Sequence, residues 1–262
     1  MTVISVASQK GGAGKTTTVL AIGQYMARAG LKVLYIDMDY QCSLTDMLGG
    51  LDAYKKTIYD ILTDDACRLS DARIGCGYGD YVAGSQMMAH LDVLLADADV
   101  KQTRLQKAIK DVSGDYDAIL IDTPPALSLA QLMAIYAADT VIIPTQADRQ
   151  HYQQLKSLIY TIGTAKGAGC DLTVYYIVTR YNPRVKINQA FNDAIEQMMD
   201  AEGIGYLGTV SDSSVIREAQ GTDADLFTDY PKSKPAKEYG SIAEQIIKDI
   251  KPSKAVRKKV KD

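Results

Sequence analysis

Short, continuous hydrophobic segments alternate along this chain with longer segments whose apolar residues recur every three to four positions. The first pattern is typical of parallel β-strands buried on both faces, and the second of amphipathic helices. Strands are predicted at residues 3–7, 33–36, 118–121, 140–144 and 172–178. Helices are predicted at residues 15–29, 100–112, 127–138, 149–165, 186–201 and 235–250. This alternation predicts an α/β fold, a single domain with a twisted, mostly parallel β-sheet flanked by helices.

The predicted domain covers residues 1–250, and residues 251–262 form a separate basic tail. The least regular part is residues 64–84, where four glycines lie close together. We interpret it as a surface excursion of the same domain rather than as a second domain. The pattern assigns no role to residues 64–100.

Composition excludes several classes of protein. Of the 262 residues, 47% are hydrophobic and 23% are charged, which is typical of an ordered globular protein and not of a disordered one. No apolar stretch approaches the length of a membrane-spanning helix, and the N-terminus does not resemble a secretory leader. The four cysteines form no CxxC pair, which argues against a zinc site or a disulfide framework. We therefore expect a cytoplasmic protein.

The net charge of −3 hides an asymmetry. The tail carries six Lys or Arg and one Asp, a charge of +5, which leaves −8 on residues 1–250. A membrane-binding amphipathic helix needs bulky apolar residues opposite its cations, and the tail offers only Ala255, Val256 and Val260. A basic arm on DNA, or a solubilising end, fits this composition better, and we expect no membrane partner.

A glycine-rich loop follows the first predicted strand and opens the first predicted helix. Converging backbone N–H groups in such a loop bind phosphate oxygens, and the helix N-terminus adds its positive dipole end. Lys15 supplies a cation for the β- and γ-phosphates, and the Thr16 hydroxyl suits Mg²⁺. Gln9 replaces the usual first glycine, and Lys10 adds a second lysine. The predicted nucleotide contacts of this P-loop NTPase fold are Gly11, Gly12, Ala13, Gly14, Lys15, Thr16 and Thr17.

Acidic residues end two further strands. Asp37 and Asp39 are two residues apart, so in extended geometry both side chains point to the same side. Asp122 ends the hydrophobic strand at residues 118–121, which is the layout of a Walker B segment. We expect Asp37 and Asp122, with Thr16, to serve as Mg²⁺ ligands, because carboxylates at these strand ends would face the phosphates.

The segment from Lys10 to Thr17 resembles the deviant Walker A box of the ParA/MinD (SIMIBI) ATPases, and the chain is most similar to small ParA/Soj-type partition proteins. This resemblance implies an ATP-bound sandwich homodimer in which Lys10 reaches the partner's nucleotide. It also implies catalytic roles for Lys10, for Lys15 and for Asp39, which takes the place of an acid tied to hydrolysis. Tyr40 departs from the family by replacing the usual proline.

The resemblance extends into the C-terminal half. It implies that Thr179 and Arg180 lie near the adenine. Basic residues expected on DNA through the same resemblance are Arg184, Arg217, Lys232 and Lys234. Contact with the phosphate backbone needs several cations on one surface and is not specific to sequence.

The predicted function is that of an ATP-dependent DNA-partitioning ATPase with ATP and Mg²⁺ as cofactors. The ATP dimer would bind DNA non-specifically on the nucleoid, and a ParB-like centromere-binding protein would stimulate hydrolysis. One alternative is a MinD-like membrane-cycling ATPase that positions a cellular assembly. A second is a metabolic P-loop synthetase that phosphorylates a small acid. The sequence leaves open the cargo and the rate of hydrolysis.

Overall fold

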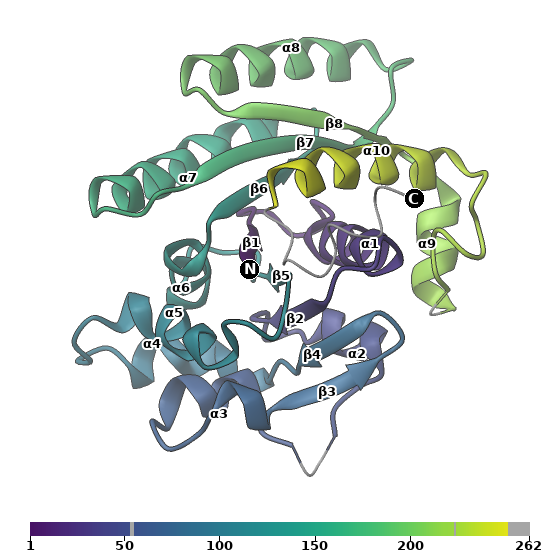
Figure 1. Ribbon diagram of the computed structural model, residues 1–262. Helices are drawn as coiled ribbons and strands as arrows, with labels where there is room; N and C mark the ends of the chain where they lie inside the picture. The colour runs from purple at the N-terminus through teal and green to yellow at the C-terminus, as the bar shows by residue number, and fades with distance from the viewer. Residues whose placement is uncertain (53–54, 223, 251–262) are drawn as a thin grey trace.

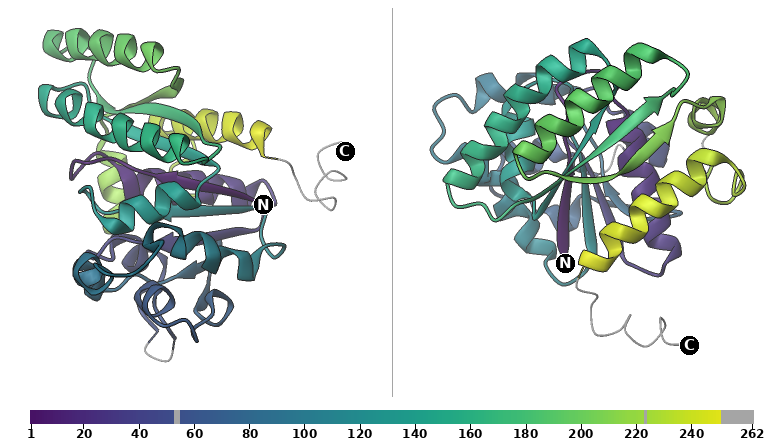
Figure 2. Two further views of the ribbon diagram at one scale, coloured as in Figure 1. Left: turned by 90° about the vertical axis from the view of Figure 1, so that its left-hand side faces the viewer. Right: turned by 90° about the horizontal axis from the view of Figure 1, so that it is seen from above.

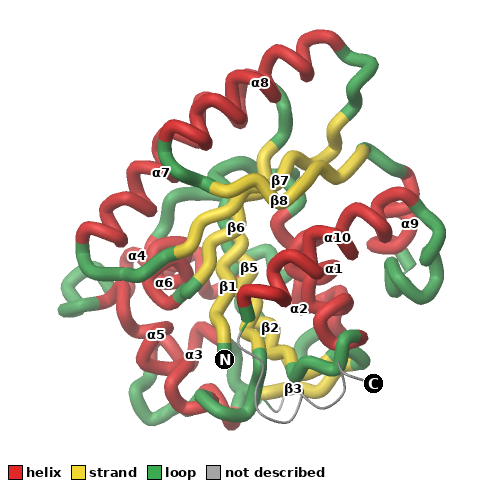
Figure 3. Tube along the Cα trace, turned by 45° about the horizontal axis from the view of Figure 1, so that its top comes forward, coloured by secondary structure: helices red, strands yellow, loops and turns green. Residues whose placement is uncertain are grey.

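The computed structural model describes residues 1–52, 55–222 and 224–250. In these residues one twisted sheet runs through the molecule in the strand order β3-β4-β2-β5-β1-β6-β7-β8 (Figure 3). Each neighbouring pair is parallel except β3–β4. The strands are β1 (Thr2–Val6), β2 (Val33–Asp37), β3 (Arg73–Cys76), β4 (Gly79–Val82), β5 (Ala118–Asp122), β6 (Thr140–Thr145), β7 (Thr173–Tyr181) and β8 (Gly205–Ser211).

Helices cover both faces of the sheet (Figure 1). One face is covered by α1, α2, α9 and α10, and the other by α3, α4, α5, α6, α7 and α8. The described helices are α1 (Lys15–Arg28), α2 (Ser43–Leu48), α3 (Ile58–Thr63), α4 (Leu91–Leu94), α5 (Arg104–Ile109), α6 (Leu129–Ala137), α7 (Arg149–Gly167), α8 (Lys186–Ala201), α9 (Ser214–Gly221) and α10 (Lys234–Asp249).

The core follows from the alternation of side chains along each central strand. On β1, Ile4 and Val6 pack into the cluster that includes α1 and α10, whereas Val3 packs into the cluster on the opposite face. All residues of β2 and β5 are buried. Because both faces of these strands are covered, their sequences are continuously apolar rather than alternating.

The predicted fold class is confirmed, and the five predicted strands correspond to β1, β2, β5, β6 and β7. Five of the six predicted helices correspond to α1, α6, α7, α8 and α10. The sixth, predicted at residues 100–112, is not one continuous α-helix. There α5 is flanked by short 3-10 turns at Lys101–Thr103 and Lys110–Val112. Four short helices, α2, α3, α4 and α9, were not predicted, and neither was β8.

The interpretation of residues 64–84 as a surface excursion is wrong. This segment contains the hairpin of β3 and β4, and β4 extends the sheet by pairing in parallel with β2. Tyr81 and Val82 are buried in the two opposite clusters. A glycine is required at position 79, where φ is +133° and a Cβ would lie 2.3 Å from the carbonyl oxygen of Val33. The glycines that suggested a loop therefore allow close contact between strands.

The two ends of the described chain lie on the side of the sheet where the central strands β1, β6 and β7 begin. The C-terminal part of α10 lies beside the start of β1 (Figure 2). Met1, Ile246 and Asp249 line a groove there. No helix among the described residues is long and apolar enough to cross a membrane. The predicted basic tail, residues 251–262, lies outside the described residues.

Candidate nucleotide-binding site

The glycine-rich loop connects β1 to α1 at the carboxyl edge of the sheet. Gly12 and Gly14 adopt left-handed backbone conformations, with φ of +75° and +87°. Gly14 is the N-cap of α1 and provides no side-chain hydrogen bond to the helix. The first backbone N–H groups of this 14-residue helix are therefore free of a side-chain cap, which suits a phosphate group.

Lys15 is the first residue of α1, and its side chain turns back toward the glycine-rich loop. Its side chain is buried, and Nζ donates to the carbonyl oxygen of Lys10 across 3.3 Å. Burial lowers the pKa of Lys15, and the nearby carboxylates of Asp122 and Asp39 oppose that shift. The structure thus brings Lys15 and both predicted acids into one electrostatic group beneath the loop.

Thr16 and Asp122 are joined directly, because the Thr16 hydroxyl donates to Oδ2 of Asp122 across 2.6 Å. Oδ1 of Asp122 is buried and has no hydrogen-bond partner in the described structure. Burial, followed by the charge of Asp37, raises the pKa of Asp122 to about 8. A buried carboxylate oxygen without a donor, next to a threonine hydroxyl, is a donor set that fits Mg²⁺.

This site would not hold a metal by protein groups alone. No cluster of three His, Cys, Asp or Glu side chains suitable for a metal occurs in the described residues. Mg²⁺ commonly keeps several waters and takes further ligands from nucleotide phosphates. The arrangement around Thr16 and Asp122 is therefore consistent with Mg²⁺ that arrives with a nucleotide.

Asp37, the other predicted Mg²⁺ ligand, is engaged within the chain. Its Oδ2 accepts hydrogen bonds from the backbone N–H and the hydroxyl of Thr45, at 2.9 and 2.7 Å. Its Oδ1 accepts from the backbone N–H of Asp39 at 3.0 Å. Gly84 packs so closely that a Cβ there would lie 3.0 Å from Cγ of Asp37. Asp37 thus fixes α2 and the end of β4 against β2, and burial raises its pKa to about 6.

Asp39 lies on the loop after β2 and is mostly buried. Its Oδ1 accepts from the backbone N–H of Gln41 across 3.0 Å, and among the described residues no other group donates to this carboxylate. Burial raises the pKa of Asp39, while the Gln41 bond and the charge of Lys15 oppose the shift. The next residue, Tyr40, which departs from the family pattern, is 41% exposed.

Lys10 contacts residues that the sequence analysis did not single out. Its Nζ lies 3.4 Å from Oδ2 of Asp148 and 3.4 Å from Nδ1 of His151. The same loop is bound at a second point, because Nε2 of Gln146 donates to the carbonyl oxygen of Gly12 across 2.7 Å. The connection between β6 and α7 therefore forms one wall of the candidate site. A carboxylate just before a predicted helix was the one available signal for Asp148.

Thr179 and Arg180 lie at the end of β7, next to the loop. The Thr179 hydroxyl is directed to two carbonyl oxygens, that of Ala13 at 2.8 Å and that of Thr145 at 3.2 Å. Arg180 has a left-handed backbone, with φ of +49°, and its guanidinium approaches Gly12. Thr179 thus supports the loop from below, and the predicted adenine contacts of both residues stay predictions.

The four predicted DNA-contacting residues are exposed. Arg184 follows β7, and Arg217 lies on α9, which follows the neighbouring strand β8. Arg217 pairs with Asp212 at 3.3 Å, and Lys234 pairs with Glu238 at 3.6 Å. Lys232 precedes α10.

A hydrogen bond connects α9 with the phosphate-loop helix. Nε2 of Gln220 on α9 donates to the hydroxyl of Thr17 on α1 across 2.8 Å. Thr17 directly follows Thr16, and Gln220 lies three residues after Arg217. The helix that carries Arg217 is therefore linked to the segment that carries the candidate Mg²⁺ ligand.

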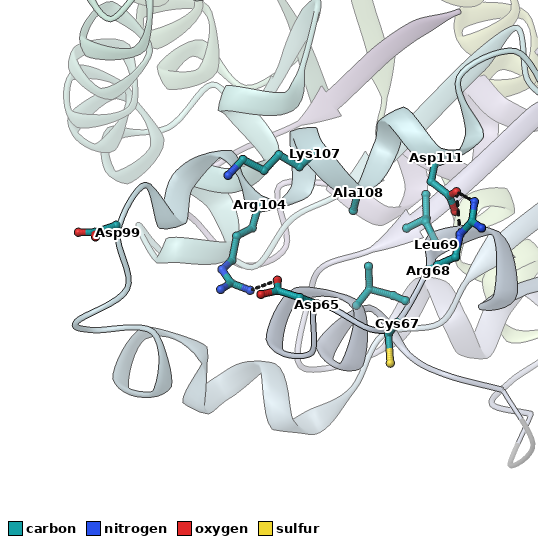
Figure 4. A pocket seen from close by; sticks show the side chains of 10 residues that line it. Asp65, Cys67, Arg68, Leu69, Asp99, Arg104, Lys107, Ala108 and Asp111 are labelled. Carbon is teal, nitrogen blue, oxygen red and sulfur yellow. Dashed lines mark hydrogen bonds and ion pairs between the residues drawn. The ribbon is translucent and has the colours of Figure 1, made fainter.

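A separate pocket of about 410 Å³ lies between α3 and α5 (Figure 4). Four of its charged side chains form two ion pairs, Arg104 with Asp65 and Arg68 with Asp111. The hydrogen bonds from Arg68 and Ser70 lower the pKa of Asp111 to about 2. None of its lining residues belongs to the phosphate loop or to the acidic strand ends. These internal pairs are consistent with a structural role.

Comparisons with known proteins identify the family of the chain. A family described as an AAA domain, AAA_31, matches residues 1–171. The chromosome-partitioning ATPase Soj of Treponema pallidum (strain Nichols) is 30% identical over 244 residues, which cover 92% of this chain and 94% of that protein. The sporulation initiation inhibitor protein Soj of Bacillus subtilis (strain 168) is 28% identical over 249 residues, which cover 93% and 97%.

Solved structures share the fold. Cobyrinic acid a,c-diamide synthase from Mycobacterium smegmatis, with bound ADP and magnesium, aligns with a TM-score of 0.80 at 25% identity over 95% of both chains. The ATP complex of a single-residue variant of McdA from Cyanothece aligns with a TM-score of 0.84 at 22% identity, over 97% of this chain and 98% of that chain. The chain therefore belongs to the AAA_31 family of P-loop domains and, within it, to the Soj/ParA family of partition ATPases.

Proposed function

We propose that this protein is an ATP-dependent DNA-partitioning ATPase. ATP and Mg²⁺ bind at the phosphate loop, two subunits close face to face, and the closed dimer binds DNA non-specifically on the nucleoid. Hydrolysis, stimulated by a ParB-like centromere-binding protein, returns the subunits to a DNA-free state. The observation that carries this proposal is a loop with two lysines, Lys10 and Lys15, backed by the Thr16–Asp122 pair.

Backbone N–H groups and a few side chains of the loop region provide the proposed nucleotide contacts. The N–H groups from Gly11 to Thr17 and the ammonium of Lys15 bind the phosphates, while Thr16 and Asp122 hold Mg²⁺. When bound, Mg²⁺ neutralises charge on the β- and γ-phosphates. Asp39 orients the attacking water, for which its largely unengaged carboxylate is suited. Asp37 acts chiefly by holding the loop that carries Asp39.

The proposed DNA contacts are made by exposed basic side chains. Arg184, Arg217, Lys232 and Lys234 lie on the surface, and two of them are held only by exposed or long ion pairs, which stabilise little. Phosphate groups of DNA can replace such carboxylate partners. The Gln220–Thr17 bond offers a route by which the nucleotide state changes the position of α9.

The test is binding to a random-sequence DNA duplex with ATP, with ADP and without nucleotide, each over a range of salt concentrations. The proposal expects binding that requires ATP and weakens steeply with salt, because cations on phosphates release counterions. Lys15→Ala should lose the ATP dependence, and Arg217→Ala should reduce the salt slope by about 1. Absence of DNA binding in all conditions would contradict the proposal.

One observation favours a second candidate, a small-molecule synthetase. The synthase from M. smegmatis is as similar in fold as the partition-type neighbours and is 25% identical. That candidate predicts ATP turnover that depends on a small carboxylic acid and not on DNA or on a centromere-binding protein. The second lysine, Lys10, favours partitioning, since a synthetase acting within one subunit has no evident use for it. Pelleting with liposomes in ATP would test the membrane-cycling alternative.

A further inference from the structure

Lys10 is held by a pair of residues at the start of α7. Asp148 is the N-cap of this helix, and its Oδ1 accepts from the backbone N–H of His151 across 2.9 Å. Its Oδ2 lies 2.8 Å from Nδ1 of His151 and 3.4 Å from Nζ of Lys10. One carboxylate thus caps the helix, fixes an imidazole and binds the lysine.

The protonation state of this group follows from its geometry. Burial raises the pKa of Asp148, but its bonds to His151 and the charge of Lys10 outweigh burial and leave the pKa below its ordinary value. The carboxylate is therefore ionised, so the proton in the 2.8 Å contact belongs to Nδ1 of His151. Lys10 consequently donates to Asp148 and not to the imidazole.

This assignment leaves Nε2 of His151 as a buried acceptor. It has no hydrogen-bond partner within the described chain, and His151 is 3% exposed. A proton added at Nε2 would place a second positive charge beside the same carboxylate. Lys10 and protonated His151 therefore compete for Asp148.

The loop is tied to α7 at another point as well. Nε2 of Gln9, the residue before Lys10, donates to the hydroxyl of Ser157 on α7 across 3.3 Å. With the Gln146–Gly12 bond, these contacts hold the leading segment of the loop against its own subunit. Lys10 in this position is directed to α7 of the same chain.

We propose that Asp148 and His151 form a dock that retains Lys10 within its own subunit and sets how readily Lys10 reaches a second subunit. Both are positioning residues, since they act through Lys10. This inference rests on the proposed function in one respect, that Lys10 acts across the dimer. The dock makes formation of the ATP dimer depend on the release of one ion pair.

The same geometry makes the dock sensitive to acid. The charged groups that act on His151 are Asp148, Lys10 and Lys15. Burial lowers the pKa of His151 below 6.5, the two lysines lower it further, and Asp148 raises it. Release of Lys10 removes a positive charge that lowers the pKa of His151, so His151 binds a proton more tightly in the undocked state. Acidification below the ordinary His range should therefore favour release of Lys10 and formation of the ATP dimer.

The first test needs no nucleotide and no dimer. Imidazole signals are followed by NMR through a pH titration of the wild type, Lys10→Ala and Asp148→Asn. Lys10→Ala should raise the pKa of His151 by about half a unit or more, since a like charge is removed. Asp148→Asn should lower it. The chain has two histidines, and the exposed His90 provides the internal reference. An unchanged His151 titration in Lys10→Ala would overturn the dock.

The second test measures dimer formation with a non-hydrolysable ATP analogue by light scattering. Asp148→Asn should tighten the dimer by about two- to fivefold, the scale of a partly exposed ion pair, while Asn still caps the helix. His151→Gln should remove the pH dependence. Asp193→Asn, an exposed position on α8, is the matched charge control.

The double variant Lys10→Ala, Asp148→Asn tests whether Asp148 acts on dimer formation through Lys10. In the Lys10→Ala background Asp148→Asn should no longer change dimer formation, and an equal tightening would show that Asp148 acts without Lys10, against the inference. If the wild type forms no dimer with the ATP analogue, the proposed function fails while the NMR titration still decides whether the dock exists.

Discussion

The hydroxyl of Thr16 and the carboxylate of Asp122 lie 2.6 Å apart although 106 positions separate them in the chain. The contact arises because β1 and β5 are parallel neighbours in a register that pairs Val6 with Asp122. The loop after β1 therefore passes directly over the last residue of β5. This relationship places the hydroxyl and the carboxylate proposed to bind Mg²⁺ in one site.

Asp122→Asn should remove most of the gain in nucleotide affinity that Mg²⁺ provides. The amide keeps the shape and can still accept from Thr16, but it lacks the charge that binds a cation. We expect a loss of about 10–100-fold or more in Mg²⁺ affinity, since even residues that only support the ligands of a bound metal contribute on that scale. Calorimetric titration with ATP in Mg²⁺ and in EDTA checks this. Equal Mg²⁺ enhancement in the variant and the wild type would exclude the role.

Asp39→Ala should slow ATP hydrolysis by about 10²–10⁴-fold, because the group that orients the attacking water is lost. Nucleotide binding should persist, so the variant should accumulate as the ATP dimer. Steady-state phosphate release and light scattering measure the two effects. Asp46→Ala, an exposed acid on the neighbouring α2, serves as the control. Turnover at the wild-type rate would remove Asp39 from the mechanism.

Gln220→Ala should weaken the link between the nucleotide and α9. The lost hydrogen bond to Thr17 corresponds to about a two- to tenfold effect, and the difference in DNA affinity between the ATP and ADP states should shrink by that factor. Binding assays at one fixed salt concentration measure it. Gln197→Ala on α8 is a matched control, and an unchanged ratio of the two affinities would argue against the link.

Gly23→Ala should destabilise the fold. A Cβ at Gly23 on α1 would lie 2.3 Å from Cε1 of Tyr35, which is fully buried on β2. Such overpacking lowers the free energy of unfolding by about 1–3 kcal/mol or more. At Gly163 on α7 a Cβ meets nothing within 4 Å, so Gly163→Ala should instead raise it by about 0.5–1 kcal/mol. Urea unfolding of both variants tests whether this helix–strand contact is as close as the structure shows.

Elements whose residues are neighbours along the chain could be predicted from the amino-acid pattern. A strand, a glycine-rich loop and a helix follow one another from Thr2 to Arg28, so both lysines of the loop could be identified locally. The acids Asp37, Asp39 and Asp122 could be found because each stands at or just after the end of an apolar strand. The buried parallel strands were recognisable because covering both faces makes them continuously apolar.

Which of these elements contact one another depends on the fold and could not be predicted from the pattern. Strands buried on both faces look alike in sequence, so their order in the sheet is not encoded in the hydrophobic pattern. That order places Asp148 and His151 against Lys10, and Gln220 against Thr17, across more than 130 positions of the chain. It also brings Thr45 and Gly84 to Asp37, where Thr45 donates to the carboxylate and Gly84 packs against it. It converts a glycine-rich stretch into a hairpin, because only glycine permits the backbone approach at Gly79.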